Sequence, residues 1–488
     1  MLLLIIAAIP LKYFMISLDG FINTWDESFH ALVAKNMAQF PLKPMLFVNP
    51  LIDYDYTSWV SNHIWLHKQP LFLWQSALCI KIFGANEISF RLPTLILSIL
   101  FIPALYRMGT LLVSKATGYI ASLFFVLSFF VNNLTSGRYP LAENDVIFMM
   151  YIGASCWAYL EYLHSQKPIW LIWIGVFAGF AVLTKWLVGL LVYSAWGSNI
   201  LIDYRTHKTH FFKSFLPMLK SLGITFLLFI PWTVYTFIRF PVEAKYEFAL
   251  NARHFSQVVE NHTGKWDFHL EMMKQIYFPF NYYILIPIVL IGVFLILKRS
   301  DRVAALCWIL IPILFYSIAE TKMQAFTVIV FPFMVIMMAA VFEMTYLMLK
   351  ERMGRMLSLT VGVYVFFMFG YYVFNVESLQ AEHSSQLVWN NYRFERIHNK
   401  PEYFKIEANI QAPLENAVLF NVPFPYNIDM MFYTSINAYA FMPTNEVIKS
   451  LHRRGYVIYV LNNKLTDDVS MNKNIIKIPS QLKAEFIW

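Results

Sequence analysis

Long apolar stretches alternate with short polar ones along the first 375 residues of the chain. A hydrocarbon core about 30 Å thick needs about 20 apolar residues per helix, and many of these stretches approach that length. Candidate spans lie near residues 2–18, 71–84, 91–113, 117–134, 144–163, 169–184, 186–202, 215–239, 281–297, 302–319, 323–349 and 355–375. The pattern predicts an α-helical polytopic membrane protein.

Basic residues cluster in the connections at 205–208, 298–299 and 350–352. The positive-inside rule assigns such connections to the cytoplasm, which places the 240–280 loop and everything after about residue 376 on the opposite face. Placing the polar 19–70 loop on that face as well requires one candidate span not to cross. The 71–84 segment is short and interrupted by Lys81. We therefore expect about 11 transmembrane helices, with the N-terminus inside and the C-terminus outside.

The composition changes after Asn375, and residues 376–488 are polar. Residues 416–422 and 456–461 are typical of short buried strands, and the intervening segment 445–454 is typical of a helix that ends at Gly455. This alternation predicts a small extracytoplasmic α/β domain after a membrane domain at 1–375. The domain has no glycine-rich phosphate loop, so we expect no nucleotide there.

Composition supports the membrane assignment. The chain is 58% hydrophobic and 14% charged, whereas a soluble protein carries roughly 25% charged residues. The net charge is +8, but the basic clusters are short and separated by apolar spans. Nucleic acid is therefore not an expected partner. The three cysteines lie in apolar segments without CxxC spacing, which favours neither a disulfide framework nor a thiolate metal site.

The 19–70 loop contains two adjacent carboxylates, Asp26 and Glu27, directly after Trp25. The residues that follow have helical periodicity, so the pair lies near the start of an interfacial helix. A carboxylate at that position is favoured by the helix dipole, which is a purely structural use. The functional alternative is a general base that takes a proton from an acceptor hydroxyl.

A second acidic residue, Asp145, precedes the span at 146–163 and follows Arg138. An isolated Asp at this position is often a helix N-cap. Under the expected topology, however, Asp145 lies on the same face as Asp26. Two converging carboxylates can share the activation of an acceptor or hold a divalent cation.

Basic residues supply the opposite charge at this face. Lys68 and Arg91 can meet lipid headgroups, or can bind a phosphate and stabilise the charge released when a sugar–phosphate bond breaks. Lys185 lies between two apolar runs, where an unpaired cation is costly, and Lys322 begins another span at the outer face. His262 is a further polar candidate in the 240–280 loop, but its spacing to His254 and Asp267 matches no zinc motif.

Several short motifs occur in the order seen in the GT-C glycosyltransferases. They are Trp25-Asp26-Glu27, Lys68-Gln69-Pro70-Leu71, Phe83-Gly84, Arg91-Leu92-Pro93, Leu183-Thr184-Lys185, Pro231-Trp232 and Thr321-Lys322. The chain most resembles the branch that contains the aminoarabinose transferase of lipid A and the protein O-mannosyltransferases. The resemblance covers about residues 20–335.

The resemblance implies an integral membrane enzyme that takes a sugar from a polyprenyl-phosphate carrier at the non-cytoplasmic face. The acidic residue of the family's first external loop corresponds to Asp26, with Glu27 beside it, and the second to Asp145. The lysine of the family's Lys-Pro-Pro motif corresponds to Lys68, although Gln69 stands where the first proline is usual. The lysine of its Leu-Thr-Lys motif corresponds to Lys185. The implied reaction is an inverting single displacement.

The resulting hypothesis is a glycosyltransferase of the bacterial inner membrane. Its candidate catalytic residues are Asp26, Glu27 and Asp145. Its candidate substrate- and phosphate-binding residues are Lys68, Arg138, Lys185, His262 and Lys322. No metal site is assigned and no cofactor is expected to be required, although an accessory divalent cation is compatible with these residues.

The expected partners are a polyprenyl-phosphate-sugar donor, membrane lipids, and an acceptor that is lipid A, a surface glycan or a protein hydroxyl. The sequence identifies neither the sugar nor the acceptor. The alternative function is a transporter or flippase of lipid-linked sugars. It predicts charges at the centres of several spans and a two-fold repeat of spans, and the sequence shows neither pattern.

Overall fold

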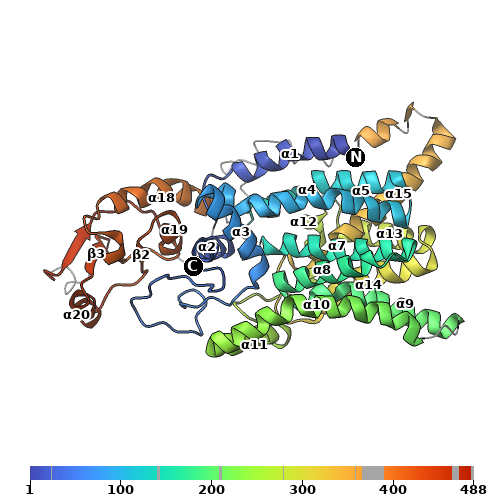
Figure 1. The fold of residues 1–488 in the computed structure, drawn as a ribbon. Coiled ribbons are helices and arrows are strands. Elements are labelled where there is room, and N and C mark those ends of the chain that lie inside the picture. Colours follow the sequence, from blue (N-terminus) through green and yellow to red (C-terminus); the bar gives the residue numbers. More distant parts are fainter. Residues whose placement is uncertain are drawn as a thin grey trace.

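The computed structural model describes residues 1–23, 25–139, 143–207, 211–277, 280–354, 356–357, 359–364, 390–463 and 472–484. It has a long helical bundle followed by a small α/β domain (Figure 1). The helices of the bundle are α1 (Leu2–Ser17), α2 (Asp26–Met37), α3 (Pro70–Phe83), α4 (Glu87–Leu112), α5 (Lys115–Leu127), α6 (Phe129–Thr135), α7 (Asn144–Ser165), α8 (Ile169–Lys185), η1 (Leu187–Leu190), α9 (Leu191–His207), α10 (Phe211–Arg239), α11 (Pro241–Ser256), α12 (Phe268–Ile276), α13 (Tyr282–Ile291), η2 (Gly292–Ile296), α14 (Arg299–Ile318), η3 (Phe326–Val330) and α15 (Phe331–Met353).

Five helical stretches of the described chain are long and apolar enough to cross a membrane, within α4, α7, α10, α14 and η3–α15. A sixth forms if the bent pair α5–α6 counts as one span. Four shorter apolar stretches lie at Leu2–Ser17, Pro70–Phe83, Ile169–Lys185 and Tyr282–Ile296. The polytopic helical prediction is confirmed. The number of about 11 crossings stays a prediction, because most of the expected span at 355–375 lies outside the described residues.

The sequence predicted a single span at 117–134, but the structure bends it by 56° between α5 and α6. The break is at Ser128, whose ψ of 115° is extended. Its hydroxyl accepts the backbone N–H of Val131 and so caps α6. The Ser128 hydroxyl takes the place of a backbone carbonyl as the acceptor for the Val131 N–H. This local hydrogen bond explains why the apolar segment does not continue as one helix.

Helix α7 lies inside the bundle and contacts α4, α8 and η3. It is apolar around its circumference, as expected for a buried span. Residues 166–168 connect it to α8, and so short a connection makes the two helices an antiparallel hairpin. The start of α7 and the end of α8 therefore lie at the same end of the bundle.

The C-terminal domain contains α18 (Asn390–Ala408), η4 (Leu414–Asn416), β1 (Ala417–Phe420), α19 (Tyr426–Tyr433), β2 (Asn437–Ala438), α20 (Asn445–Arg453), β3 (Val457–Leu461) and β4 (Ile475–Ile478). The strands form a parallel sheet in the order β2-β1-β3-β4, in which Ala417 pairs with Val457. The predicted strands and helix correspond to β1, β3 and α20, and Gly455 follows α20 with φ 84°. The small α/β domain is confirmed, except that residues 376–389, 464–471 and 485–488 lie outside the described residues.

The C-terminal domain lies against α2, at the opposite end of the molecule from the last turns of α9 (Figure 1). Lys35 of α2 donates to the carbonyls of Met431 (2.8 Å) and Phe432 (2.9 Å) at the end of α19. A cation at a helix C-terminus satisfies its last carbonyls and favours its dipole. The interfacial helix that carries the acidic pair is thus held between the bundle and this domain.

Candidate active site

The acidic pair starts helix α2. Asp26 is the first residue of the helix and follows Trp25, whose backbone has φ 61° and ψ −116°. Strained backbone at a non-glycine residue is concentrated at functional sites. Here the turn places the Asp26 carboxylate at the helix N-terminus, where the dipole favours negative charge.

The Asp26 carboxylate meets basic side chains from two elements. Lys68 Nζ, in the segment before α3, lies 3.3 Å from Asp26 Oδ1, and both side chains are 17% exposed. His30 Nε2, one turn along α2, lies 3.8 Å from the same oxygen. Burial would raise the pKa of Asp26, but Lys68, His30 and His67 outweigh it and lower that pKa to about 2. The carboxylate is therefore ionised at neutral pH.

Asp145 forms a second ion pair at the same end of the bundle. It lies in the first turn of α7, and its Oδ1 contacts Nζ of Lys185, the last residue of α8. Lys68 also faces this region. Burial would lower the pKa of Lys68, but the negative charges of Asp26, Glu260 and Asp145 together raise it above its usual value. The two ion pairs therefore belong to one charged cluster.

His254, near the end of α11, interacts electrostatically with the lysines of the charged cluster. Burial is the largest reason why the pKa of His254 falls to about 4. Electrostatic interactions with His67, Lys68, Lys185 and His262 lower this pKa further. Two lysines beside two carboxylates suit a ligand that carries negative charge.

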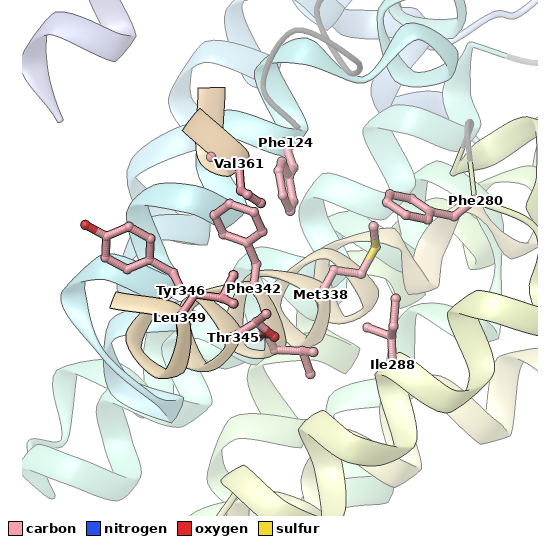
Figure 2. Close-up of a pocket in the computed structure, with 11 residues that line it drawn as sticks. Phe124, Phe280, Ile288, Met338, Phe342, Thr345, Tyr346, Leu349 and Val361 are labelled. Atoms are coloured by element: carbon pink, nitrogen blue, oxygen red, sulfur yellow. Dashed lines mark hydrogen bonds between the residues drawn. The ribbon is translucent and has the colours of Figure 1, made fainter. Parts of the chain in front are cut away.

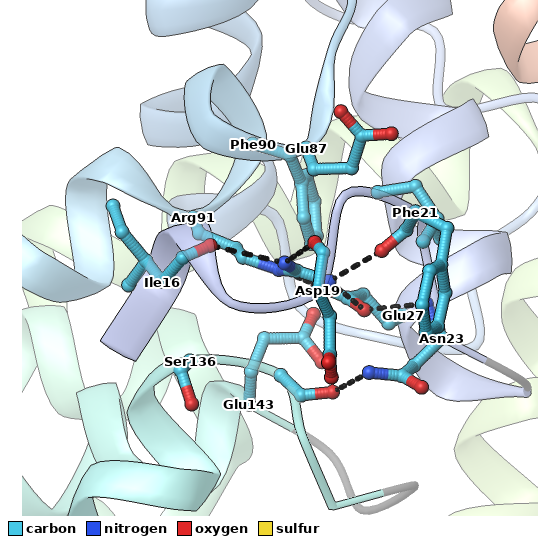
Figure 3. Close-up of polar contacts among 12 residues, drawn as sticks. Ile16, Asp19, Phe21, Asn23, Glu27, Glu87, Phe90, Arg91, Ser136 and Glu143 are labelled. Atoms are coloured by element: carbon cyan, nitrogen blue, oxygen red, sulfur yellow. Dashed lines mark hydrogen bonds and ion pairs between the residues drawn. The ribbon is translucent and has the colours of Figure 1, made fainter. Parts of the chain in front are cut away.

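Glu27 forms an ion pair with Arg91 and not with the lysine beside Asp26. Its two carboxylate oxygens accept from Arg91 of α4, with Nε–Oε1 2.6 Å and Nη2–Oε2 2.9 Å (Figure 3). Arg91 also donates to the carbonyls of Ile16, Asp19 and Phe21, so it joins the end of α1 to the start of α2. Both members of the pair are 2% exposed. These contacts favour a positioning role for Glu27, and its catalytic role stays a prediction.

Three predicted binding residues are engaged in other contacts. Arg138 Nη1 lies 3.6 Å from Asp19 Oδ1 in a buried position. The Lys322 ammonium donates to three carbonyls at the end of α14, while its backbone N–H donates to the His262 carbonyl at 2.9 Å. The His262 ring is 42% exposed and 4.0 Å from Glu260. Their phosphate-binding roles stay predictions, and these contacts favour positioning of the external loop.

Sequence reasoning gave no role to His30, His254 or Glu143. His30 is four residues after Asp26, so helical periodicity alone places it on the same face. Glu143 is the N-cap residue of α7, the position that the sequence analysis considered for Asp145. His254 reaches the cluster from α11, and no local pattern predicts that contact.

Metal ligation has no support from side-chain grouping. Among the residues that the structure describes, no three His, Cys, Asp or Glu side chains are placed to share a metal ion. The absence of an assigned metal site therefore stays a prediction of the sequence.

An apolar cavity of about 250 Å³ lies elsewhere, between α5, α13 and α15 (Figure 2). Its lining includes Phe124, Ile288, Met338 and Phe342, and none of its lining residues is charged. Such a lining can hold hydrocarbon but cannot move a proton or bind a phosphate. The charged cluster is therefore the better candidate for a reaction site than this cavity.

Comparison with known proteins relates this arrangement to membrane glycosyltransferases. Residues 67–235 match the family described as dolichyl-phosphate-mannose-protein mannosyltransferase. An uncharacterized protein from Aquifex aeolicus (strain VF5) is 31% identical over 177 residues, which are 36% of this chain and 32% of that protein. The chain thus matches about a third of the length of this curated relative.

Solved structures are similar over nearly the whole chain. ArnT from Cupriavidus metallidurans bound to undecaprenyl phosphate gives a TM-score of 0.67 at 14% identity, covering 94% of this chain and 89% of that one. The apo state of that protein gives 0.61 at 14% identity, covering 94% and 88%. The archaeal oligosaccharyltransferase AglB from Archaeoglobus fulgidus, in complex with an inhibitory peptide and a dolichol-phosphate, gives 0.56 at 11% identity, covering 91% and 64%.

These likenesses confirm the GT-C fold that the motifs predicted, of the type found in ArnT and the protein mannosyltransferases. The match at 67–235 begins at the segment that carries Lys68 and includes Asp145 and Lys185. The fold and the charged cluster therefore point to the same part of the chain.

Proposed function

We propose that the chain is a membrane glycosyltransferase that transfers a sugar from a polyprenyl-phosphate donor to an acceptor hydroxyl. The observation that carries the proposal is the charged cluster at the start of α2. An ionised carboxylate, Asp26, lies 3.3 Å from Lys68, and Lys185 is held nearby by Asp145. A base for a hydroxyl and cations for a phosphate are thus adjacent. Undecaprenyl phosphate in ArnT and dolichol-phosphate in AglB support a lipid-linked donor.

The reaction follows from this placement. The acceptor oxygen attacks the anomeric carbon of the donor sugar while the Asp26 carboxylate takes the hydroxyl proton. The bond from the anomeric carbon to the phosphate oxygen breaks, and its electron pair leaves with the phosphate. Lys68 and Lys185 stabilise the negative charge that develops there. One displacement inverts the anomeric configuration and needs no covalent intermediate.

The location is also part of the proposal. The basic stretch that begins with Arg205 lies in the last turn of α9. The last turns of α9 are at the opposite end of the bundle from α2 and the C-terminal domain (Figure 1). The positive-inside rule then places the charged cluster and the α/β domain outside the cytoplasm. We place the protein in a bacterial inner membrane, with lipid A, a surface glycan or a protein hydroxyl as acceptor.

A transfer assay in detergent micelles tests the proposal. Purified protein is incubated with labelled polyprenyl-phosphate-linked mannose, glucose or aminoarabinose, together with glycolipids and membrane proteins from a deletion strain. We expect label to reach an acceptor in micelles, where nothing can be transported across a membrane. A wild-type protein that moves these lipids across vesicle membranes but transfers no sugar in micelles would instead be a transporter.

Asp26→Asn tests the base directly. Because a positioned general base contributes about 10²- to 10⁴-fold in rate, we expect a loss of that order with normal expression. Asp55→Asn is the matched control. Asp55 is exposed in the same external loop, and its carboxylate is bound only by Thr57 among the contacts described. Wild-type turnover in Asp26→Asn would exclude Asp26 as the base.

We further propose that no metal ion is required. A carboxylate can take the acceptor proton alone, and lysines can perform the charge stabilisation that a divalent cation supplies in other transferases. EDTA is therefore expected to reduce the transfer rate modestly or not at all. Complete loss of activity that Mg²⁺ or Mn²⁺ restores would show that the carboxylates hold a metal.

A further inference from the structure

His30 lies between two carboxylates that come from different elements. Its Nε2 is 3.8 Å from Asp26 Oδ1, and its Nδ1 is 2.5 Å from Oε1 of Glu143, which directly precedes α7. The ring is fully buried, and the rings of Trp65 and Phe72 meet it edge-on at centroid distances of 5.6 and 4.9 Å. A buried charged group is costly unless it is paired. The three side chains therefore lie where a charge on one can be balanced by the others.

Some polar atoms of His30 and Glu143 make no hydrogen bond within the described residues. In the part of the chain that the structure describes, His30 Nε2 and Glu143 Oε2 are buried and have no hydrogen-bond partner. A carboxylate only accepts, so the short contact requires His30 Nδ1 to be the donor to Glu143. In the neutral imidazole, Nε2 then carries the lone pair and faces Asp26.

We propose that His30 and Glu143 form a proton relay behind Asp26, a role that rests on the proposed function. Asp26 takes the proton of the acceptor hydroxyl during the displacement. The proton then passes from the Asp26 carboxyl to Nε2 of His30, which restores the Asp26 carboxylate and leaves an imidazolium. The carboxylate of Glu143 stabilises that imidazolium through the Nδ1–H bond. After the displacement the imidazolium returns the proton through the Asp26 carboxylate to the departing phosphate, so each proton is accounted for.

The chemistry of Asp26 explains why a relay is useful. Lys68 lowers the pKa of Asp26 in the empty site, and even an ordinary carboxyl group does not keep its proton at neutral pH. A neighbouring imidazole is a better proton acceptor than such a carboxylate. The other charged groups around the relay are Lys68 beside Asp26 and Glu27, whose ionisation Glu143 opposes from the start of α7. His30 is therefore a positioning residue that acts on the acceptor only through Asp26.

The competing explanation is that His30 merely ties α2 to the start of α7. His30→Gln separates the two, because an amide can donate to Glu143 but cannot take up a proton. Glu143→Gln removes the negative charge and keeps the shape. His269→Gln is the matched control, since His269 is also a fully buried histidine. It lies on α12, outside the charged cluster.

The measurement is the pH dependence of kcat and KM in the micelle assay, with the polyprenyl-phosphate sugar that the wild-type protein uses. We expect wild-type kcat to fall in acid, because a relay that already carries a proton cannot accept another. His30→Gln should lower kcat about 10²-fold, leave the donor KM unchanged and abolish this acid limb. Glu143→Gln should move the limb to lower pH, because losing a neighbouring negative charge disfavours the imidazolium. His269→Gln should keep the wild-type profile.

A uniform loss of kcat at all pH values in His30→Gln, with the acid limb retained, would overturn the relay and leave a structural tie. If His30→Gln does not fold, the position of the acid limb in Glu143→Gln decides, and an unmoved limb overturns the relay. Either result leaves the proposed function intact. Absence of transfer by the wild-type protein with every donor would instead overturn the proposed function and the relay together.

Discussion

At the scale of single residues, the charged cluster couples the base to the donor. Burial raises the pKa of Asp26, and Lys68 contributes most to the opposing effect that lowers this pKa to about 2. A donor phosphate that binds Lys68 competes with Asp26 for the same ammonium. The pKa of Asp26 then rises toward its usual range, which makes the carboxylate a stronger base. Under the proposed function, donor binding therefore makes Asp26 a stronger base, and in the empty site Asp26 stays in the ion pair with Lys68.

His254 gives a prediction about pH and stability. Burial and the neighbouring cations lower the pKa of His254 to about 4, against an ordinary value of 6.5. Between these values the unfolded chain binds more protons than the folded one, so stability is lost as pH falls from about 6.5 to 4. His254→Gln should lose less thermal stability over this interval than the wild-type protein. The measurement is the unfolding temperature in micelles at pH 7 and pH 4.5.

The control for this prediction is His452→Gln, a substitution at an exposed position of α20. It should keep the wild-type dependence of unfolding temperature on pH. An equal loss of stability in His254→Gln and wild type would show that protonation of other groups governs the acid response.

Sequence patterns identified the centre of the site but not its surroundings. Lys185 was found because an unpaired cation between apolar runs is costly. Asp26, Asp145 and Lys68 were found as opposite charges expected at one membrane face and from the family motifs. The fold brings all four together. Lys322 satisfied the same criterion as Lys185, yet its ammonium binds helix carbonyls. A local sequence pattern shows that a charged side chain is costly to bury. It does not show which group binds that side chain in the folded protein. The partner depends on contacts between elements far apart in the chain.

At the scale of elements, the start of α2 depends on a close approach by Gly137. This glycine has φ 67°, and a Cβ on it would lie 2.7 Å from Cδ of Glu27. The side chain of Asn23 also donates to the Gly137 carbonyl. The turn before α7 is thus packed directly against the Glu27–Arg91 pair shown in Figure 3. Only a residue without a side chain fits at that point.

Gly137→Ala should therefore disturb α2 from a distance. Alanine is strained at positive φ, which costs more than about 1 kcal/mol, and its methyl group displaces the Glu27 carboxylate from Arg91. We expect a lower unfolding temperature and a reduced transfer rate. Gly197→Ala in α9 is the control, because nothing lies within 4 Å of the added Cβ. Equal unfolding temperatures and rates in the two variants would show that α2 tolerates the displacement.

Element boundaries followed from the sequence where the cause is local. The start of α2 at Asp26 and the end of α20 before Gly455 were both predicted from residues next to the boundary. The bend at Ser128 was not, because serine occurs in many unbroken helices. Strands β2 and β4 were also missed. They are two and four residues long, and their place in the sheet is set by pairing with β1 and β3.

At the scale of the whole molecule, Arg396 of α18 joins the C-terminal domain to α2. Its Nη1 is 2.8 Å from Oδ2 of Asp429 and also donates to the carbonyl of Ile22. Its Nη2 donates to the Ser28 hydroxyl on α2 at 3.3 Å. Ile22 and Ser28 lie on the two sides of Asp26 in the chain. The α/β domain therefore fixes the turn that presents the base, although it contributes no residue to the charged cluster described above.

Arg396→Met tests this coupling. Leaving Asp429 buried without its partner costs about 3–5 kcal/mol, whereas replacing both members by apolar residues is often neutral. Arg396→Met should therefore destabilise the domain, and Arg396→Met combined with Asp429→Leu should recover much of that stability. The double variant still lacks the bonds to Ile22 and Ser28. We expect faster amide hydrogen exchange in α2 and a low transfer rate despite the recovered unfolding temperature.

The control is Arg453→Met, at an exposed arginine whose described hydrogen bond stays within α20. It should keep wild-type exchange in α2 and wild-type transfer. The decisive comparison is between stability and rate in the double variant. If its transfer rate returns to the wild-type value together with its unfolding temperature, the domain matters only for stability. If the rate stays low while the domain is stable, the arginine contacts that cross from α18 to α2 are what hold Asp26 in place for reaction.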